Sequence, residues 1–249
     1  MRAVIAFALA LVLALPLEAL GRGLLDRRRM LTAEEHTAWR AVGRVNIALF
    51  DERGMCTGTL IAEDIVLTAA HCVISSRTGE IFAPGNIHFV AGWRQGQSVG
   101  HSKAASITIH PRYRHQGDDP LEQIGTDLAL IRLRQAIPPQ AAPAFRVAPT
   151  PGGDASLTLI SYRRDRAHAL TRQEGCEVRG AEGSVLALGC DVTFGASGSP
   201  VFAEIDGERR LVAVISAMSR TRGQNIAWAV RVDEAIAELL FGLELKAVR

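Results

Sequence analysis

Residues 191–200 read DVTFGASGSP and set Ser197 between two glycines, in a run of very small residues that ends at a proline. Such a run is typical of a surface turn, because glycine adopts backbone angles that other residues avoid and proline interrupts regular ladders. A serine in this turn is either an ordinary loop residue or a nucleophile that the loop presents. The rest of the chain has to distinguish these two interpretations.

Short apolar segments separated by glycine and proline recur on both sides of this turn. They include GRVNIALF (43–50), NIHFVAGW (86–93), DLALIRL (127–133), RRLVAVISAM (209–218) and NIAWAVRV (225–232). Strands at this spacing predict an all-β barrel or sandwich. The alanine-rich run LTAAHC (67–72) stays open between strand and helix, because alanine favours the helix.

A proline-rich connection divides these segments into two sets. Residues 134–154 hold five of the chain's ten prolines and two adjacent glycines. Because proline cannot donate a hydrogen bond to a β-ladder, we expect an extended linker between two β units. After the second set, Ile236, Leu239 and Leu240 recur at helical spacing. This spacing predicts a C-terminal helix over about 232–241.

The first residues predict an export signal. An arginine at position 2 precedes an apolar run over 3–15, Pro16 ends the run, and small residues follow. A run of about 13 apolar residues is shorter than the roughly 20 that a helix needs to span a bilayer. We therefore expect a signal peptide over 1–21 rather than a membrane anchor, followed by an N-terminal arm or propeptide over 22–39.

Export determines how the four cysteines are interpreted. Cysteines form disulfides in an oxidising compartment, and the chain has no CxxC spacing of the kind that holds a metal. Four cysteines allow three pairings, which sequence alone does not distinguish. We prefer Cys56 with Cys72 and Cys176 with Cys190, because each pair would join neighbouring predicted strands. The expectation is two disulfides, no metal and a secreted or periplasmic protein.

Composition and charge argue against a nucleic-acid partner. The chain has 249 residues, of which 48% are hydrophobic and 22% charged, so it can bury a substantial core. Its formal net charge is only +2, and the arginines are scattered along the sequence. A nucleic-acid-binding surface usually has a concentrated basic patch instead. The composition is that of an ordinary globular protein.

Two residues elsewhere in the chain suit catalysis by Ser197. A serine hydroxyl needs a base within hydrogen-bond reach and a third group that orients the base. His71 precedes Cys72, and Asp127 begins an apolar segment. Each residue alone has an ordinary structural interpretation. Their order of histidine, aspartate and serine nevertheless matches one known triad and differs from the order of serine, acid and histidine in α/β-hydrolases.

Four motifs together resemble the trypsin-like, chymotrypsin-fold serine peptidases. They are TAAHC at 68–72, HPRY at 110–113, DLAL at 127–130 and GASGSP at 195–200. The resemblance covers roughly residues 40 to 241, and the serine motif is most similar to bacterial secreted glutamyl endopeptidases and their relatives. Trypsins carry an aspartate where this chain has Ala196, so a trypsin-style activation switch is not expected.

The resemblance implies two six-stranded antiparallel β-barrels with the active site in the cleft between them. The peptidase domain would span 40–249, with barrel one over about 40–133, the linker over 134–154, barrel two over about 155–231 and the helix over about 232–241. This division agrees with the proline-rich linker that the residues themselves predict.

The resemblance also implies a role for each matched residue. His71 is the general base, Asp127 orients it and Ser197 is the nucleophile. The N–H groups of Gly195 and Ser197 would bind the oxyanion. Ser216 would support Asp127.

The same resemblance indicates where a substrate would bind. Ser216, Ala217 and Met218 are the substrate-binding candidates. Asp191 stands where trypsins carry the aspartate that binds arginine or lysine. Glutamyl endopeptidases can also carry an aspartate there, so substrate specificity stays open.

The sequence therefore predicts a secreted serine endopeptidase that acts on protein or peptide substrates without a cofactor. We expect a monomer that is not inserted in a membrane once the signal is removed, and activity that falls on acidification through a pKa of about 6 to 7. The alternative is a catalytically silent binding module on the same scaffold. A second alternative is a protease-chaperone of the high-temperature-requirement type, and proteins of that type normally add a PDZ domain after the protease.

Overall fold

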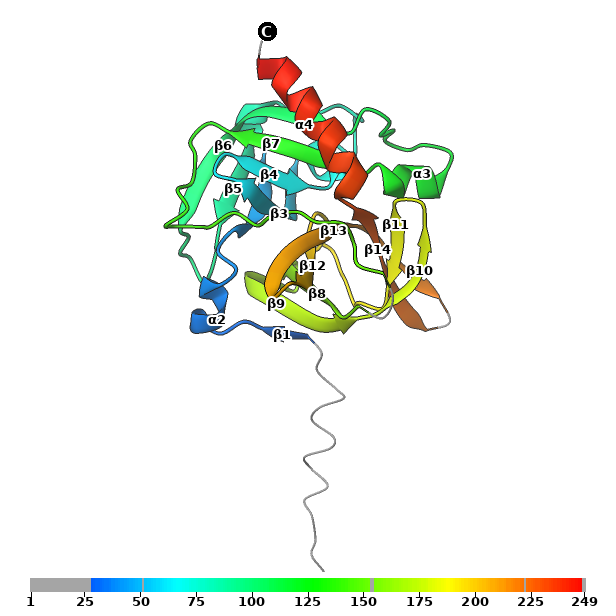
Figure 1. Ribbon diagram of the computed structural model, residues 1–249. Coiled ribbons are helices and arrows are strands. Elements are labelled where there is room, and N and C mark those ends of the chain that lie inside the picture. Colours follow the sequence, from blue (N-terminus) through cyan, green and yellow to red (C-terminus); the bar gives the residue numbers. More distant parts are fainter. Residues whose placement is uncertain (1–27, 51, 153–154, 222, 248–249) are drawn as a thin grey trace, which may run out of the picture.

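The computed structural model describes residues 28–50, 52–152, 155–221 and 223–247. These residues form two antiparallel β-sheets, which lie one above the other in Figure 1, with helix α4 (Asp233–Ala247) crossing the upper one. The expected signal peptide, residues 1–21, lies outside the described residues, as do residues 22–27 of the expected arm. In the described part of the chain, no helix is long and apolar enough to cross a membrane.

The first sheet is a closed barrel. Its six strands, in spatial order, are β2 (Val42–Ala48), β3 (Arg53–Ala62), β4 (Ile65–Thr68), β7 (Ala129–Leu133), β6 (Gly100–Ile109) and β5 (Ile87–Ala91). Buried and partly exposed residues alternate along much of β2 and β5, because successive side chains of a strand point to opposite faces. The inward side chains, among them Val45, Phe89 and Ile131, form one core.

The second sheet has eight strands. In spatial order they are β1 (Arg28–Met30), β9 (Arg166–Cys176), β8 (Leu157–Arg163), β12 (Pro200–Ile205), β13 (Glu208–Thr221), β14 (Gln224–Arg231), β11 (Val185–Leu188) and β10 (Val178–Glu182). The structure confirms the fold class, which is all-β with two antiparallel sheets, one of them a closed six-stranded barrel, and a C-terminal helix. The second sheet differs from the expected six-stranded barrel, because no pairing among the described residues joins β1 to β10.

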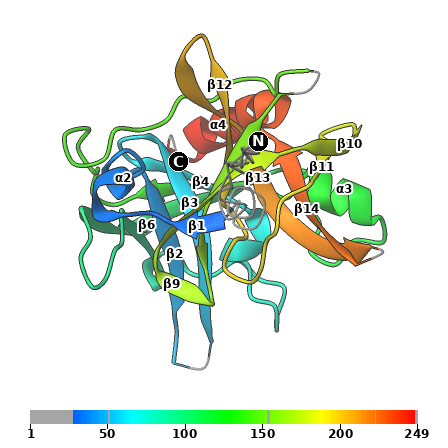
Figure 2. The same ribbon diagram turned by 90° about the horizontal axis from the view of Figure 1, so that it is seen from below.

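The described part of the N-terminal arm packs on the second sheet. β1 pairs with β9, with Arg28 opposite Gln173, and so occupies one end of the sheet. Helix α2 (Ala33–Thr37) follows and begins with a capping box, in which Thr32 and Glu35 bond each other's backbone N–H groups. Seen from below in Figure 2, α2 lies on the opposite side of the molecule from α3 (Pro120–Gly125). The arm from Arg28 onward is thus part of the folded molecule.

A shared core joins the two sheets. Residues 134–152 run from β7 to β8 without forming a strand, and their Phe145 packs against Trp39 and Phe202 at ring-centroid distances of 5.8 and 4.6 Å. Helix α4 contributes Leu239 to this core and extends beyond the expected end near residue 241. Because this core includes residues of both sheets, it fixes their relative position.

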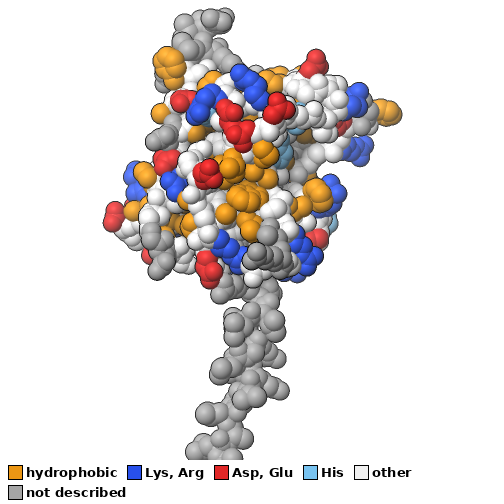
Figure 3. Space-filling model, turned by 90° about the vertical axis from the view of Figure 1, so that its right-hand side faces the viewer, with side chains coloured by type: hydrophobic (Ala, Val, Ile, Leu, Met, Phe, Trp, Pro, Cys, Tyr) orange, Lys and Arg blue, Asp and Glu red, His pale blue; other side chains and the backbone are white. Residues whose placement is uncertain are grey.

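The surface carries charges of both signs. On the face shown in Figure 3, acidic and basic side chains are interspersed, and hydrophobic side chains gather near the centre. This mixture agrees with the small formal net charge of +2. This face therefore has no continuous basic stripe.

Candidate active site

His71 and Asp127 meet at one end of the barrel. The run LTAAHC is strand as far as Thr68, and the short 3₁₀ helix η1 (Ala70–Val73) then carries His71. The Asp127 side chain is buried, with Oδ2 at 2.6 Å from His71 Nδ1 and Oδ1 accepting the His71 backbone N–H at 2.9 Å. Because an ionised carboxylate only accepts hydrogen bonds, Nδ1 carries the ring proton and Nε2 has a free lone pair.

Ser216 on β13 gives the same carboxylate a third hydrogen bond. Its hydroxyl donates to Asp127 Oδ2 at 2.6 Å. Burial lowers the pKa of His71, but the charge of Asp127 and the hydrogen bond to it outweigh burial and raise that pKa above its ordinary value. The His71 side chain is 31% exposed, so the imidazole also has access to the surface. A histidine held in this way can accept a proton and keep it briefly.

The loop that carries Ser197 is pressed against β3 and β4. Gly198 N–H donates to Ile215 O at 2.7 Å, and Thr57 N–H donates to Ser197 O at 2.8 Å. Gly198 has a φ of +76°, and a Cβ atom there would lie 2.2 Å from both Thr57 O and Thr68 Oγ1. Only glycine combines this φ with so close an approach. The loop therefore lies beside the strand that leads to His71.

The peptide group before Gly195 has a fixed orientation. Arg164 N–H donates to Phe194 O at 2.8 Å, and the N–H of a planar trans peptide points away from its C=O. Gly195 has a φ of +91°, and a Cβ atom there would lie 2.5 Å from Met55 Cε. Thr57 Oγ1 holds the next carbonyl, Gly195 O, at 3.0 Å. The Gly195 N–H is left without an acceptor among the described residues.

The peptide group before Ser197 is fixed in the same way. Ser199 N–H donates to Ala196 O at 3.0 Å, and the Ser197 N–H has no acceptor within the described chain. Two unpaired donors in one tight turn suit an oxygen that becomes negatively charged. The Ser197 hydroxyl makes no hydrogen bond to any described residue. Such contacts are often loose in serine hydrolases without a ligand and tighten on binding.

Both predicted disulfides are confirmed. Cys56 on β3 bonds Cys72 in η1, and Cys176 at the end of β9 bonds Cys190, with Cα–Cα distances of 6.0 and 5.1 Å. The ligand atoms of Cys56, His71 and Cys72 lie within 4.8 Å of one another. Both sulfurs are consumed in the disulfide, however, and a metal site needs thiolates. This group of three is therefore not a metal site.

A pocket of about 280 Å³ opens beside Ser197. Its lining residues are Val192, Thr193, Phe194, Ala196, Ser197, Ile215, Ser216, Ala217 and Met218. Three candidates for substrate binding, Ser216, Ala217 and Met218, are thus brought together. Asp191 is not among the lining residues; its carboxylate pairs with the Arg28 guanidinium and accepts from Asn225 Nδ2 at 2.7 Å.

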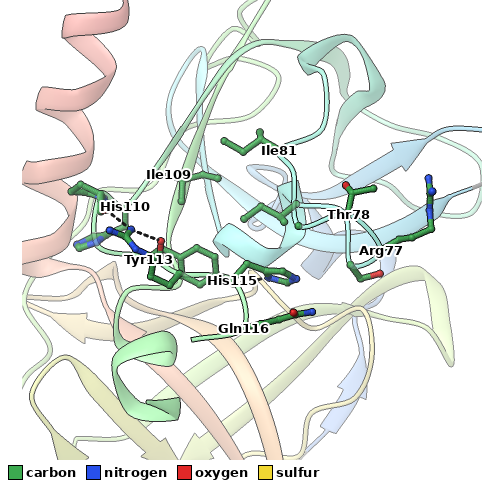
Figure 4. Close-up of a pocket in the computed structure, with 13 residues that line it drawn as sticks. Arg77, Thr78, Ile81, Ile109, His110, Tyr113, His115 and Gln116 are labelled. Carbon is green, nitrogen blue, oxygen red and sulfur yellow. Dashed lines mark hydrogen bonds between the residues drawn. The ribbon is translucent and has the colours of Figure 1, made fainter. Parts of the chain in front are cut away.

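A second hollow, of about 540 Å³, lies between residues 74–81 and 109–116 (Figure 4). His110 and His115 both line it but do not form a pair. His110 Nε2 lies 3.4 Å from Glu238 Oε2, whereas His115 Nδ1 lies 3.4 Å from the Tyr113 hydroxyl. Burial raises the pKa of Tyr113, and the charge of Asp127 raises it further. Tyr113 therefore lines this hollow within range of the charge of the buried Asp127 carboxylate.

Thr57 joins the two sheets at the site, although nothing in the sequence singles it out. Its hydroxyl donates to Gly195 O and accepts the Tyr162 N–H, each at 3.0 Å. These partners are 138 and 105 residues away in the sequence. A local pattern cannot reveal contacts of this kind, because they exist only once both sheets are in place.

The closed barrel, the second sheet and the His71–Asp127 pair define the class of β-barrel serine peptidases. The family model described as Trypsin matches residues 32–238, so the chain belongs to the trypsin family. Membership confirms the resemblance in the sequence motifs and the prediction of a serine-type endopeptidase, which is a hydrolase that acts on proteins or peptides.

Solved structures share this fold at low sequence identity. The thermostable serine protease AL20 from an extremophilic microorganism matches with a TM-score of 0.67 and 17% identity, over 82% of this chain and 98% of its own. A Glu endopeptidase in complex with MPD matches with a TM-score of 0.69 and 18% identity, over 89% of this chain and 97% of its own. The protease Anisep from Arthrobacter nicotinovorans matches with a TM-score of 0.64 and 15% identity, over 82% of this chain and 93% of its own. At these identities the likeness establishes the fold alone.

Proposed function

We propose that this chain is a secreted serine endopeptidase that cleaves peptide bonds through an acyl-enzyme on Ser197. The observation that carries the proposal is the 2.6 Å contact between His71 Nδ1 and the buried carboxylate of Asp127. This contact leaves Nε2 as the basic nitrogen, and the loop that has the family's serine motif packs against the strand that leads to His71. Nucleophile, base and orienting acid are the three groups that acyl transfer requires.

Acylation begins when Ser197 Oγ attacks the carbonyl carbon of the scissile bond. His71 Nε2 accepts the hydroxyl proton, and the carbonyl oxygen takes the electron pair and becomes negatively charged. The N–H groups of Gly195 and Ser197 donate to this oxygen. The imidazolium, stabilised by Asp127, then gives its proton to the leaving amine as the C–N bond breaks.

Deacylation repeats these steps with water. His71 accepts a proton from a water molecule, which attacks the ester carbon, and the oxyanion forms again at the same two N–H groups. The imidazolium returns its proton to Ser197 Oγ as the ester bond breaks. The products are two shorter peptides, and the cycle needs no cofactor.

The pocket beside Ser197 receives the side chain on the acyl side of the scissile bond. Residues 216–218 of β13 line this pocket and would also pair with the backbone of the substrate. Two disulfides suit an oxidising compartment, which supports a secreted or periplasmic location for the enzyme. We propose that it acts there as a monomer, after loss of the signal peptide over 1–21.

A catalytically silent binding module is the competing function. The unpaired Ser197 hydroxyl favours it, because a resting triad often has a hydrogen bond from serine to histidine. The three hydrogen bonds at the buried Asp127 carboxylate favour the enzyme, since a binding module has no need of an oriented imidazole.

Covalent labelling separates the two functions. We would treat the full-length protein and its Ser197→Ala variant with a fluorophosphonate probe and, in parallel, with a protein substrate. Labelling and cleavage that disappear in Ser197→Ala support the endopeptidase. The exposed Ser98 supplies a control, because Ser98→Ala should keep both signals. Labelling that persists in Ser197→Ala, or its absence from the unmodified protein, would contradict the proposal.

A further inference from the structure

The pocket beside Ser197 is apolar. One wall consists of Val192, Thr193 and Phe194, and the other of residues 215–218. Val192 and Ile215 are buried, with relative exposures of 6% and 2%. None of the described residues that line the pocket is Lys, Arg, His, Asp or Glu.

The polar groups in the pocket offer little to a charged ligand. The Ser216 hydroxyl already donates to Asp127 Oδ2 at 2.6 Å. The hydroxyls of Thr193 and Ser197 remain, and neither can neutralise a charge. Moving a carboxylate or a guanidinium from water into such a pocket costs free energy unless a counter-ion receives it. An aliphatic or aromatic side chain gains free energy from the same transfer.

Asp191, the residue that could supply a negative charge, is engaged elsewhere. Its carboxylate pairs with Arg28 of β1 and accepts from Asn225 Nδ2 at 2.7 Å. Its backbone N–H donates to Gln173 Oε1 at 3.0 Å, on the strand that pairs with β1. The pair with Arg28 holds the Asp191 side chain against the N-terminal arm. The next residue, Val192, is the first to line the pocket.

The mouth of the pocket is also apolar. Phe194 and Met218 line it and are 60% and 44% exposed, which is unusual for large hydrophobic side chains. The guanidinium of Arg164 lies 4.9 Å from the centre of the Phe194 ring, but Arg164 is not among the lining residues. A substrate side chain that enters between Phe194 and Met218 would remove apolar surface of both residues from water.

We propose that this pocket selects peptide bonds that follow an uncharged, apolar residue such as leucine, methionine or phenylalanine. The inference rests on the proposed function and adds its substrate class. The apolar walls favour such a residue. The Arg28–Asp191 pair explains why an aspartate six positions before Ser197 does not bring a preference for arginine or lysine.

The test compares matched peptides that differ only at the residue before the scissile bond. We would use the full-length protein, expressed with its own N-terminal segment, and measure kcat/KM with Leu, Glu or Arg at that position. We expect Leu to exceed both Glu and Arg by about 100-fold. Equal or higher values for Glu or Arg would overturn the inference.

Two exposed methionines supply a variant and its control. Met218 at the mouth is 44% exposed, and Met30 on β1, which does not line the pocket, is 47% exposed. Met218→Lys places an ammonium group at the mouth of the pocket, where it can pair with a glutamate of the substrate. The Glu-to-Leu ratio of kcat/KM should therefore rise about fivefold, as expected for a partly exposed ion pair. Met30→Lys should leave that ratio unchanged. The same rise in both variants would contradict the proposed pocket.

Asp191→Asn tests the alternative in which this carboxylate binds the substrate. The order of preference among Leu, Glu and Arg should not change, because the carboxylate is paired with Arg28 and Asn225 and does not line the pocket. A selective loss of cleavage after Arg would overturn the inference. Fluorophosphonate labelling of Ser197 is measured in the same samples. Labelled protein that cleaves after Glu or Arg refutes the apolar pocket alone, whereas absence of both labelling and cleavage refutes the proposed function and the inference with it.

Discussion

Asp127 holds His71 at two points, by the ring Nδ1 at 2.6 Å and by the backbone N–H at 2.9 Å. One buried carboxylate therefore sets both the orientation of the imidazole and the position of η1. The two contacts depend on charge in different ways. The backbone N–H needs only an acceptor, whereas the ring needs an acceptor that leaves Nε2 free to take a proton.

Asp127→Asn should separate these two contacts. The amide oxygen can still accept the backbone N–H, but the amide NH₂ would donate to Nδ1 and move the ring proton to Nε2. An imidazole in that form cannot accept the proton of Ser197. We expect kcat to fall about 10⁴-fold, the size of effect known for this substitution in a serine protease triad, with little change in stability.

A surface aspartate provides the control for that experiment. Asp64 pairs with Arg132 at 2.8 Å, and both side chains are 35% exposed. Asp64→Asn should therefore leave kcat unchanged. A kcat of Asp127→Asn within tenfold of the unmodified protein would show that another group orients His71.

The activity should depend on pH through His71. The base form of the imidazole is needed, and its ordinary pKa is about 6.5. Burial lowers the pKa of His71, but the charge and hydrogen bond of Asp127 raise it above this value. As the pH falls through the raised pKa, His71 becomes protonated and kcat/KM declines. We expect the half-maximal kcat/KM to lie above pH 6.5, and a profile that is flat between pH 5 and 8 would rule out this role for His71.

Local patterns in the sequence predict much of this molecule. Short apolar segments such as 43–50 and 127–133 predict strands, and the structure has strands in both places. The preferred local disulfides are the ones that form, because each cysteine pair lies in neighbouring strands or turns. The order of His71, Asp127 and Ser197, together with the residues around them, was sufficient to indicate the family.

Features that depend on distant residues could not be predicted in this way. Counting back from Ser197 places Asp191 near a pocket, but the direction of its side chain depends on Arg28, far earlier in the chain. The second sheet has eight strands, one of them β1 from the N-terminal arm, and no pairing among the described residues closes it into a barrel. The role of Thr57 likewise depends on bringing the two sheets together.

Gly198→Ala should both destabilise the protein and disturb the site. The left-handed backbone costs a residue with a Cβ atom about 1–2 kcal/mol. The methyl group would also lie 2.2 Å from Thr57 O and Thr68 Oγ1, and overpacking of this kind costs about 1–3 kcal/mol more. The loop must shift away from β3, so we expect a lower melting temperature and a lower kcat.

Gly207→Ala isolates the effect of that clash. Gly207 has a similar φ of +74°, but no atom lies within 4 Å of its added Cβ. It should lose only the backbone contribution to stability and keep its kcat. Equal effects of the two substitutions on stability and kcat would contradict the close contact between the Ser197 loop and β3.

The two disulfides should contribute similarly to stability but differently to catalysis. Their sequence separations are 16 and 14 residues, and closing a loop of this size stabilises by about 3 kcal/mol in the chain-entropy model. Replacing Cys56 and Cys72 by alanine frees η1, which carries His71, so kcat should fall. Replacing Cys176 and Cys190 loosens the wall that begins at Val192, so KM should rise more than kcat falls. Denaturant unfolding measures the loss of stability, and steady-state kinetics measures kcat and KM. The same change in kcat and KM for the two variants would show that neither bridge acts on its own part of the site.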